Sequence, residues 1–250
     1  MPLPLETAMN EDRADAGSAQ EGASPITHHP SPITASPIRE FAMRAVLWMP
    51  LAFVVWLWFA PFWVWPAMLL AKQILLGAWG EIFLAVSLGG ETLDSVGRVV
   101  GRAGHLVQLA TSVMVRVPAG PGGPGGVGVL EPTVNPMVYA YSLPLFCGLA
   151  MATPLPARRR ALQLLVALLV IWAGQGLGIV AEALKTIAFD SGPEGASAIA
   201  AAGLSRPAIA LSYQFSYLIV PAVVPALLWI GLNRDFIEQM VGSAREPSRD

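Results

Sequence analysis

Four long stretches without a charged residue set the limits on what this chain can fold into. They lie between Arg44 and Lys72, Glu131 and Arg158, Arg160 and Glu182, and Arg206 and Arg234. Each gap offers 21 to 27 uncharged positions, and a helix needs roughly 20 apolar residues to span a bilayer. The sequence therefore predicts a polytopic membrane protein with four transmembrane helices.

The composition agrees with this prediction and excludes some partners. The chain has 250 residues, of which 54% are hydrophobic and 13% are charged, against about 25% charged in ordinary soluble domains. We expect membrane lipids to cover the apolar surface. The net charge of -2 gives no reason to expect nucleic acid, which favours a clustered basic face. The single cysteine, Cys147, excludes an internal disulfide and a cysteine-only metal site.

The fold class predicted is an all-α integral membrane protein with an amphipathic helical region and a possible small β-hairpin. Residues 1–42 contain few large apolar side chains and read as a disordered tail. The first membrane segment covers 43–71, where Pro50 and Pro61 suggest kinks or an early end. The domain 136–233 holds helices two to four, at about 136–154, 161–181 and 209–232, and 234–250 is a short polar tail.

Residues 72–135 are expected to form the largest region outside the membrane. Val96, Val99, Val100 and Ala103 recur at helical spacing, which predicts an amphipathic helix within 73–112 that lies on or near the membrane surface. Two short β-prone runs, 106–117 and 127–134, flank a Gly/Pro-rich tract and indicate either a hairpin or a disordered loop.

The arginines predict the topology. Arg39 and Arg44 flank the start of the first segment, three arginines fill the turn at 155–160, and others follow the last segment. With four crossings, all three clusters lie on one side, which the positive-inside rule makes cytoplasmic. We therefore expect a bacterial inner-membrane protein with both termini in the cytoplasm and with two periplasmic loops, about 66–135 and 183–208.

The candidate functional residues are polar or small residues in or beside the membrane segments. Polar groups there are functional candidates by default, although most serve as hydrogen bonds between helices. Glycines permit close helix packing, either within the chain or with a partner. The candidates are Asn135, as a helix N-cap, and Tyr139, Gly174, Gln175, Gly178, Glu182 and Gln214.

The sequence offers no evident catalytic chemistry. Cys147 is expected about 16 Å deep in the membrane, from 11 residues at 1.5 Å each, where a thiol without a base is inert. No P-loop, zinc-protease or dinucleotide motif is present, so we expect no cofactor and no metal.

The second half of the chain resembles the exosortase H-associated membrane proteins. The tracts that carry the resemblance span 135–145, 150–154 with the basic turn, 175–176 and 182–185. The resemblance implies an accessory role beside exosortase, a membrane enzyme that handles secreted proteins with a C-terminal sorting signal. The layout is also similar to exosortase itself. Exosortases, however, carry Cys, Arg and His near the outer surface, so no catalytic residue is carried over.

Three hypotheses remain open from the sequence. The first is a non-catalytic partner of an exosortase in protein sorting. The second is a membrane cysteine transpeptidase-like protein, which needs Cys147 at an aqueous surface. The third is a small transporter or channel subunit, which needs a water-filled path lined by Gln175 and Gln214.

Overall fold

The computed structural model describes residues 37–93, 98–117 and 125–245. The helical elements are α1 Pro37–Trp58, α2 Ala60–Trp79, α3 Met137–Ala140, α4 Ser142–Ala152, α5 Ala157–Lys185, η1 Thr186–Asp190, α6 Gly192–Ala201, α7 Arg206–Gln214, η2 Phe215–Ile219, α8 Val220–Leu232 and α9 Arg234–Arg245. The strands are β1 Phe83–Leu93, β2 Val99–Thr111, β3 Met114–Val117, β4 Gly126–Val129 and β5 Thr133–Val134.

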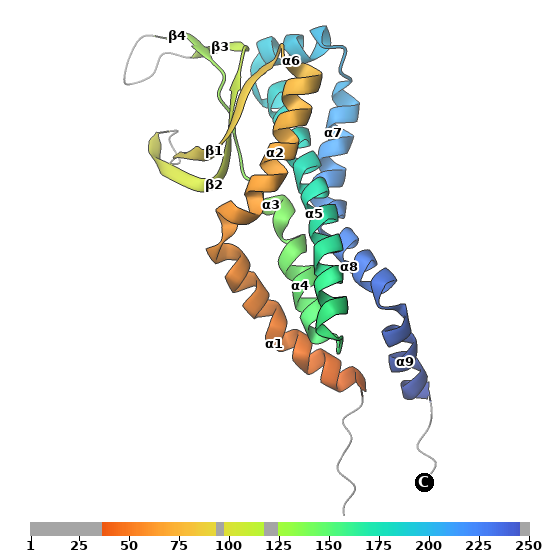
Figure 1. Cartoon of the computed structure of the whole chain (residues 1–250). Coiled ribbons are helices and arrows are strands. Elements are labelled where there is room, and N and C mark those ends of the chain that lie inside the picture. Colours follow the sequence, from red (N-terminus) through yellow and green to blue (C-terminus); the bar gives the residue numbers. More distant parts are fainter. Residues whose placement is uncertain (1–36, 94–97, 118–124, 246–250) are drawn as a thin grey trace, which may run out of the picture. The chain divides into compact units, whose positions relative to one another are not determined.

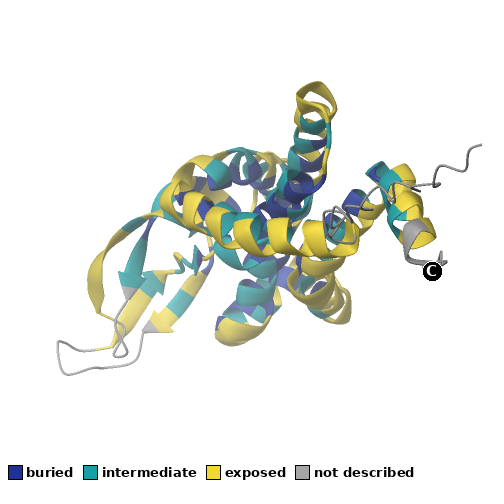
Figure 2. Cartoon of the chain, turned by 90° about the horizontal axis from the view of Figure 1, so that it is seen from below, coloured by how far each residue is buried: buried dark blue, intermediate teal, exposed yellow. Residues whose placement is uncertain are grey.

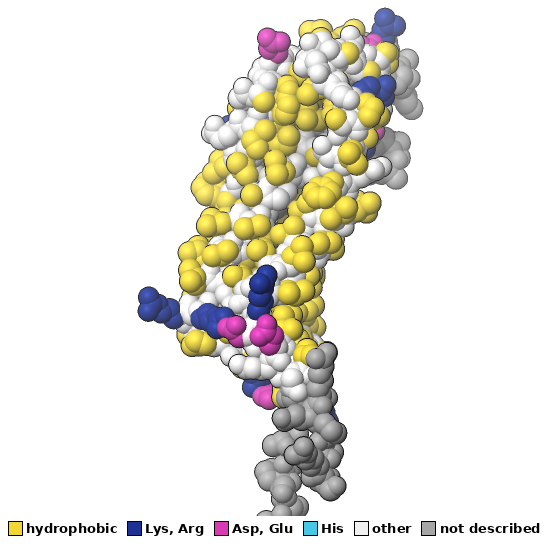
Figure 3. All heavy atoms as spheres, turned by 90° about the vertical axis from the view of Figure 1, so that its right-hand side faces the viewer, with side chains coloured by type: hydrophobic (Ala, Val, Ile, Leu, Met, Phe, Trp, Pro, Cys, Tyr) yellow, Lys and Arg dark blue, Asp and Glu magenta, His cyan; other side chains and the backbone are white. Residues whose placement is uncertain are grey.

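The expected fold class, with four helices long and apolar enough to span a membrane, is confirmed, although the four are not all those expected. Among the described residues, four helical spans are long and apolar enough to cross a bilayer: Pro37–Trp58, Ala60–Trp79, Ala157–Asp190 and Arg206–Leu232. A shorter apolar helix covers Met137–Ala152. Hydrophobic side chains cover the middle of the face in Figure 3, between charged groups above and below.

The first expected segment is two helices. The helix is interrupted at Phe59, two residues before Pro61 in the first turn of α2. A proline inside a helix clashes with the preceding turn and lacks an amide hydrogen, so a new helix begins there. Met49 on α1 packs against Gly148 of α4, whereas Leu70 on α2 packs against Gly176 of α5. The two helices thus follow one another along the bundle (Figure 1).

The last expected segment also contains a distortion caused by proline. Its helix passes through the wide π turn η2 directly before Pro221 at the start of α8. Proline supplies no amide hydrogen to the preceding turn, and a π turn is one way in which a helix absorbs that loss. Pro225 lies one turn later inside α8.

The prediction of an amphipathic helix over 73–112 is wrong from Phe83 onward. Helix α2 ends at Trp79, and β1 and β2 then pair antiparallel from Phe83–Thr111 to Leu93–Val99. Gly89 takes a φ of 92° beside an irregularity in the register, a conformation that glycine adopts without strain. Side chains in the second half of β2 are buried at every other position, the period of a strand rather than a helix.

The expected hairpin is confirmed. Strand β3 pairs antiparallel with β4, with Met114 opposite Val129 and Val117 opposite Gly126. Strand β5 instead joins the other sheet beside β2. Of the expected disordered tail at 1–42, residues 37–42 belong to α1, and 1–36 lie outside the described residues. The expected tail at 234–250 is helical through Arg245.

A buried core runs through the bundle and under the sheet. The largest fully buried apolar side chains come from α2, the strands, α4 and the second half of α5, among them Leu75, Phe83, Leu109, Phe146 and Ile179. Exposed residues face outward along the helices (Figure 2). Helix α5 lies at the centre, because α2, α3, α4, α7 and α8 all pack on it.

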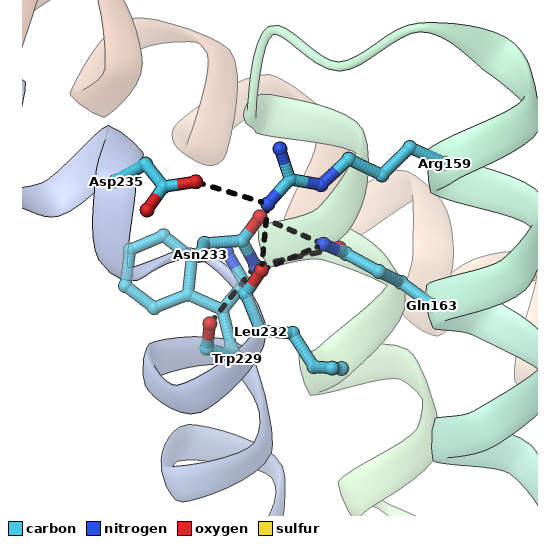
Figure 4. A network of polar contacts seen from close by, with 6 residues as sticks. All are labelled: Arg159, Gln163, Trp229, Leu232, Asn233 and Asp235. Carbon is cyan, nitrogen blue, oxygen red and sulfur yellow. Dashed lines mark hydrogen bonds and ion pairs between the residues drawn. The ribbon is translucent and has the colours of Figure 1, made fainter.

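Polar side chains connect the helices at the end of the bundle where α5 begins (Figure 4). We call this end the basic end. Gln163 donates to the side chain of Asn233 at 3.0 Å and to the carbonyl of Leu232 at 3.1 Å. Arg159 forms a 3.5 Å ion pair with Asp235. Trp229 donates to Thr153 at 2.9 Å. These contacts join the start of α5, the end of α4 and the junction between α8 and α9.

The start of α1 belongs to the same end. The Phe41 ring stacks on Trp229 at 5.3 Å and meets Phe236 of α9 at 5.6 Å. The described members of all three arginine clusters that the sequence singled out therefore lie at or beside the basic end.

Candidate interaction site at the far end of the bundle

Near the other end of α5, Tyr139 and Glu182 join α3 to α5. The Tyr139 hydroxyl donates a 2.8 Å hydrogen bond to Oε2 of Glu182. Tyr139 is 2% exposed, and its ring lies against Gly178, where an added Cβ would stand 2.6 Å from Cδ1 of the ring. A side chain at position 178 would exclude the tyrosine. Three of the seven sequence candidates thus form one contact.

Asn135 and Gln175 hold the start of α3 in place. The Asn135 side chain accepts a 3.1 Å hydrogen bond from the amide of Met137, which satisfies one of the unpaired donors of a helix start. The helix begins one residue later than expected, with Pro136 at the cap position. Gln175 is 2% exposed and donates to the carbonyl of Pro136 at 3.4 Å.

The glycines of α5 face different neighbours. An added Cβ would lie 2.9 Å from Val220 of α8 at Gly174, and 2.9 Å from Leu70 of α2 at Gly176. Together with Gly178 under Tyr139, these positions bring three elements close to the α5 backbone. Of the two roles considered for Gly174 and Gly178, their contacts fit packing within the chain.

Two further tyrosines extend the cluster across α7 and η2. The Tyr213 and Tyr217 rings stack at 5.7 Å, and Tyr217 meets the edge of Tyr139 at 6.3 Å. The Lys185 ammonium lies 5.5 Å from the centre of the Tyr213 ring and forms a 2.7 Å ion pair with Asp190. We call this set the tyrosine cluster: Tyr139, Glu182, Lys185, Asp190, Tyr213 and Tyr217.

The sequence reasoning did not include Tyr213, Tyr217 and Lys185 in the site. Their spacing held a usable signal, since 213 and 217 stand four residues apart, as do neighbours on one helix face. Two π turns adjoin the cluster, with η1 following Lys185 and η2 containing Tyr217. Such turns are frequent at functional sites.

An open cavity of about 290 Å³ lies beside the cluster, between α3 and the η2 turn. Val138, Tyr141, Tyr217 and Leu218 line it. Tyr217 is 41% exposed and Leu218 62% exposed. Gln214, the remaining sequence candidate, is exposed at the end of α7. Apolar and aromatic side chains around a hollow are typical of a surface that receives another protein.

Cys147 lies elsewhere, in an apolar cavity of about 210 Å³ between α1, α2 and α4. The other residues of its lining are Trp48, Leu51, Ala52, Val55, Trp56, Trp63, Leu143, Pro144 and Met151. None of these side chains is a base that accepts a thiol proton. This environment keeps a thiol protonated and unreactive. Across residues 37–93, 98–117 and 125–245, His, Cys, Asp and Glu form no group of three that fits a metal ion.

Comparison with known proteins shows the family to which the chain belongs. No curated protein and no solved structure matches the chain. The family model for the exosortase H-associated membrane protein matches residues 35–236. That range includes all the described membrane spans, the strands and the whole tyrosine cluster. The chain therefore belongs to the family of exosortase H-associated membrane proteins.

Proposed function

We propose that this protein is a non-catalytic accessory protein of the inner membrane that binds an exosortase through the surface beside the tyrosine cluster. The cavity between α3 and η2 is the observation that carries this proposal. The position of the bilayer, the cavity beside the tyrosine cluster and the environment of Cys147 support it.

The bilayer position follows from α5. The 21 uncharged positions between Arg160 and Glu182 give a length of about 32 Å at 1.5 Å per residue, close to the roughly 30 Å of a hydrocarbon core. The basic end then lies at one surface and the tyrosine cluster at the other. Tyrosine is enriched at this level of a membrane. Helix α6 lies beyond that surface.

Four crossings result: α1 with the start of α2, α3 with α4, α5, and α7 with α8. The short turn 155–160 holds three arginines, whereas the longer loop 183–208 holds one lysine and one arginine. The positive-inside rule then puts the basic end and both termini in the cytoplasm. The tyrosine cluster faces the periplasm.

A partner in the same membrane can reach the cavity at this level. Helices in lipid associate through close packing and polar contacts, because lipid tails are as apolar as leucine. The cavity offers both, with Leu218 and Val138 as packing surface and two tyrosine hydroxyls as polar groups. The hydrogen bond between Tyr139 and Glu182 fixes α3 against α5. It thereby fixes the position of the cavity wall that α3 supplies.

The alternatives fit less well. A cysteine transpeptidase needs Cys147 beside a base and water, yet its cavity is lined by apolar side chains and tryptophans. A transporter needs a path lined by Gln175 and Gln214, yet Gln175 is buried and bonded to Pro136, and Gln214 is exposed.

Co-purification with exosortase H tests the proposal with a matched pair of substitutions. Leu218 and Leu227 are 62% and 61% exposed, and of the two only Leu218 lines the cavity. Leu218→Ala with Tyr217→Ala should weaken binding roughly tenfold or more, a loss of about 1.4 kcal/mol, while Leu227→Ala leaves it unchanged. Full binding by the double variant would contradict the assigned surface. An equal loss with Leu227→Ala would also contradict it.

A further inference from the structure

Two tryptophans that line the apolar cavity around Cys147 have buried indole nitrogens without a hydrogen-bond acceptor. Trp56 on α1 is 7% exposed, and Trp63 lies on α2, just beyond the joint between the two helices. Neither Nε1 atom has a hydrogen-bond partner among the described residues. A buried donor without a partner costs stability, so each nitrogen calls for an acceptor from outside the chain.

Other indole nitrogens of the bundle find their acceptors within the chain. Trp172 donates a 2.9 Å hydrogen bond to the backbone carbonyl of Trp63. Trp229 donates a 2.9 Å hydrogen bond to the hydroxyl of Thr153. The unpaired donors are therefore a local feature of the cavity wall and not a general property of the tryptophans in this bundle.

Neighbouring aromatic rings do not replace the missing acceptors. Phe53 meets Trp56 edge-on with 5.9 Å between ring centres, and Phe62 meets Trp63 in the same way at 4.9 Å. The face of an aromatic ring accepts a hydrogen bond only weakly. Both indole nitrogens can therefore donate a full hydrogen bond to a bound molecule.

The cavity lies inside the hydrocarbon core of the membrane. The carbonyl of Trp63 accepts its hydrogen bond from Trp172, which stands near the middle of the uncharged stretch of α5. The joint between α1 and α2 is therefore near mid-bilayer. Trp56 follows Arg44 by 12 residues, about 18 Å along the helix at 1.5 Å per residue. Phospholipid carbonyls lie at the edge of the core and do not reach it.

The size and the lining of the cavity restrict its occupant. Its volume of about 210 Å³ is below the roughly 300–1,000 Å³ of sites for drug-sized ligands, which suits a single ring. The lining side chains supply indole N–H groups and sulfur atoms but no strong acceptor. Water needs two to four polar partners, and its two hydrogens would find none here. An apolar molecule with carbonyl oxygens suits both the lining and the unpaired donors.

The cavity opens toward the lipid chains. Leu51 and Val55 belong to its lining and are 47% and 44% exposed, so a molecule dissolved in the hydrocarbon core reaches it without crossing the headgroups. The indoles of Trp48, Trp56 and Trp63 supply aromatic walls, on which a flat ring packs in offset or edge-on contact. The occupant is thus a flat ring that carries carbonyls and dissolves in lipid.

We propose that the Cys147 cavity binds the ring of a membrane quinone. Its carbonyl oxygens accept hydrogen bonds from Trp56 and Trp63, its ring packs among the indoles, and its apolar tail leaves past Leu51 and Val55 into the bilayer. This inference depends on the bilayer position proposed above and not on the binding of an exosortase.

Binding of a tritiated decyl-substituted benzoquinone to the full-length protein in phospholipid nanodiscs tests the proposal, and empty nanodiscs measure the probe dissolved in lipid. We expect saturable binding of one quinone per protein above the level of the empty nanodiscs. Trp56→Phe combined with Trp63→Phe keeps two apolar rings but removes both donors, and should weaken binding roughly tenfold. Trp58→Phe is the matched control, because Trp58 is 80% exposed and lies outside the cavity lining. It should bind as the wild type does.

A second probe isolates the hydrogen bonds from the apolar contact. Decylbenzene lacks the carbonyls, so the wild type should bind it more weakly than the quinone, and the double variant should bind it as the wild type does. If the double variant does not fold, Trp56→Phe and Trp63→Phe alone should each weaken quinone binding about threefold.

Four results would overturn the proposal: no saturable binding of the quinone, equal binding of quinone and decylbenzene, full quinone affinity in the folded Trp56 and Trp63 variants, or an equal loss in Trp58→Phe. Enzyme fusions measure the topology separately, so a failure of quinone binding leaves the bilayer position standing.

Discussion

The Tyr139 hydroxyl donates a 2.8 Å hydrogen bond to Glu182 across 43 residues of sequence. This bond fixes the short helix α3 against α5 and sets one wall of the cavity in which we expect a partner to bind. The same ring covers Gly178, so the polar contact and the packing contact depend on each other.

Removing the hydroxyl should destabilise the protein. In Tyr139→Phe the partly buried carboxyl group of Glu182 loses its donor, a change that costs about 1–3 kcal/mol. Thermal unfolding in detergent measures this as a lower midpoint. Tyr141→Phe is the control, since its hydroxyl has no hydrogen-bond partner within the described part of the chain. Equal unfolding midpoints for the two variants would show that the hydrogen bond between Tyr139 and Glu182 does not stabilise the protein.

Adding a methyl group at Gly178 should destabilise the protein through a steric clash rather than through a lost hydrogen bond. Gly178→Ala places a Cβ 2.6 Å from the Tyr139 ring, and overpacking of this kind typically costs about 1–3 kcal/mol. Gly231→Ala in α8 is the control, because nothing lies within 4 Å of its added Cβ and alanine favours a helix by about 1 kcal/mol over glycine. If unfolding shows no difference between the two, the tyrosine is not packed as described.

The fold was partly predictable from the sequence. Uncharged length located the apolar helical regions, because a bilayer imposes one minimum span, but it did not show that the first region is two helices or that a further helix follows Arg234. The β3–β4 hairpin was predictable from the glycine-rich tract between its two strands. The strands at 83–111 were misread because Val96, Val99, Val100 and Ala103 satisfy a helical spacing by coincidence. The alternation of Val107, Leu109 and Thr111 was the better signal.

The site was predictable only as separate residues. Asn135, Tyr139, Gln175, Gly178 and Glu182 were each identified, but the pairing of Tyr139 with Glu182 depends on how α3 returns to α5, which local pattern does not encode. The cavity depends on the π turn before Pro221. A single sequence indicates a kink there but not its direction.

Fusions to alkaline phosphatase test the topology. The reporter is active only outside the cytoplasm, so fusions after Gly125 and Ser197 should be active, and fusions after Arg160 and Asp250 should not. The decisive case is Arg160. If α1 and α2 each crossed the bilayer separately, the basic turn would face the periplasm and the Arg160 fusion would be active.

Cys147 should be unreactive and dispensable. Its apolar cavity keeps the thiol protonated and away from water. In intact cells a membrane-impermeant maleimide should leave Cys147 unlabelled while labelling a Val127→Cys variant, and Cys147→Ser should retain the exosortase in co-purification. Labelling of Cys147 combined with loss of sorting in Cys147→Ser would revive the transpeptidase hypothesis.

Site-specific photocrosslinking in living cells tests the proposed docking surface most directly. A photoreactive amino acid replaces Tyr217 at the cavity or, in a parallel strain, Leu227 on the lipid-facing side of α8, which is 61% exposed. The account predicts an adduct with exosortase H from position 217 and none from 227. An adduct from 227 alone, or none from 217 in cells where the two proteins still co-purify, would contradict it.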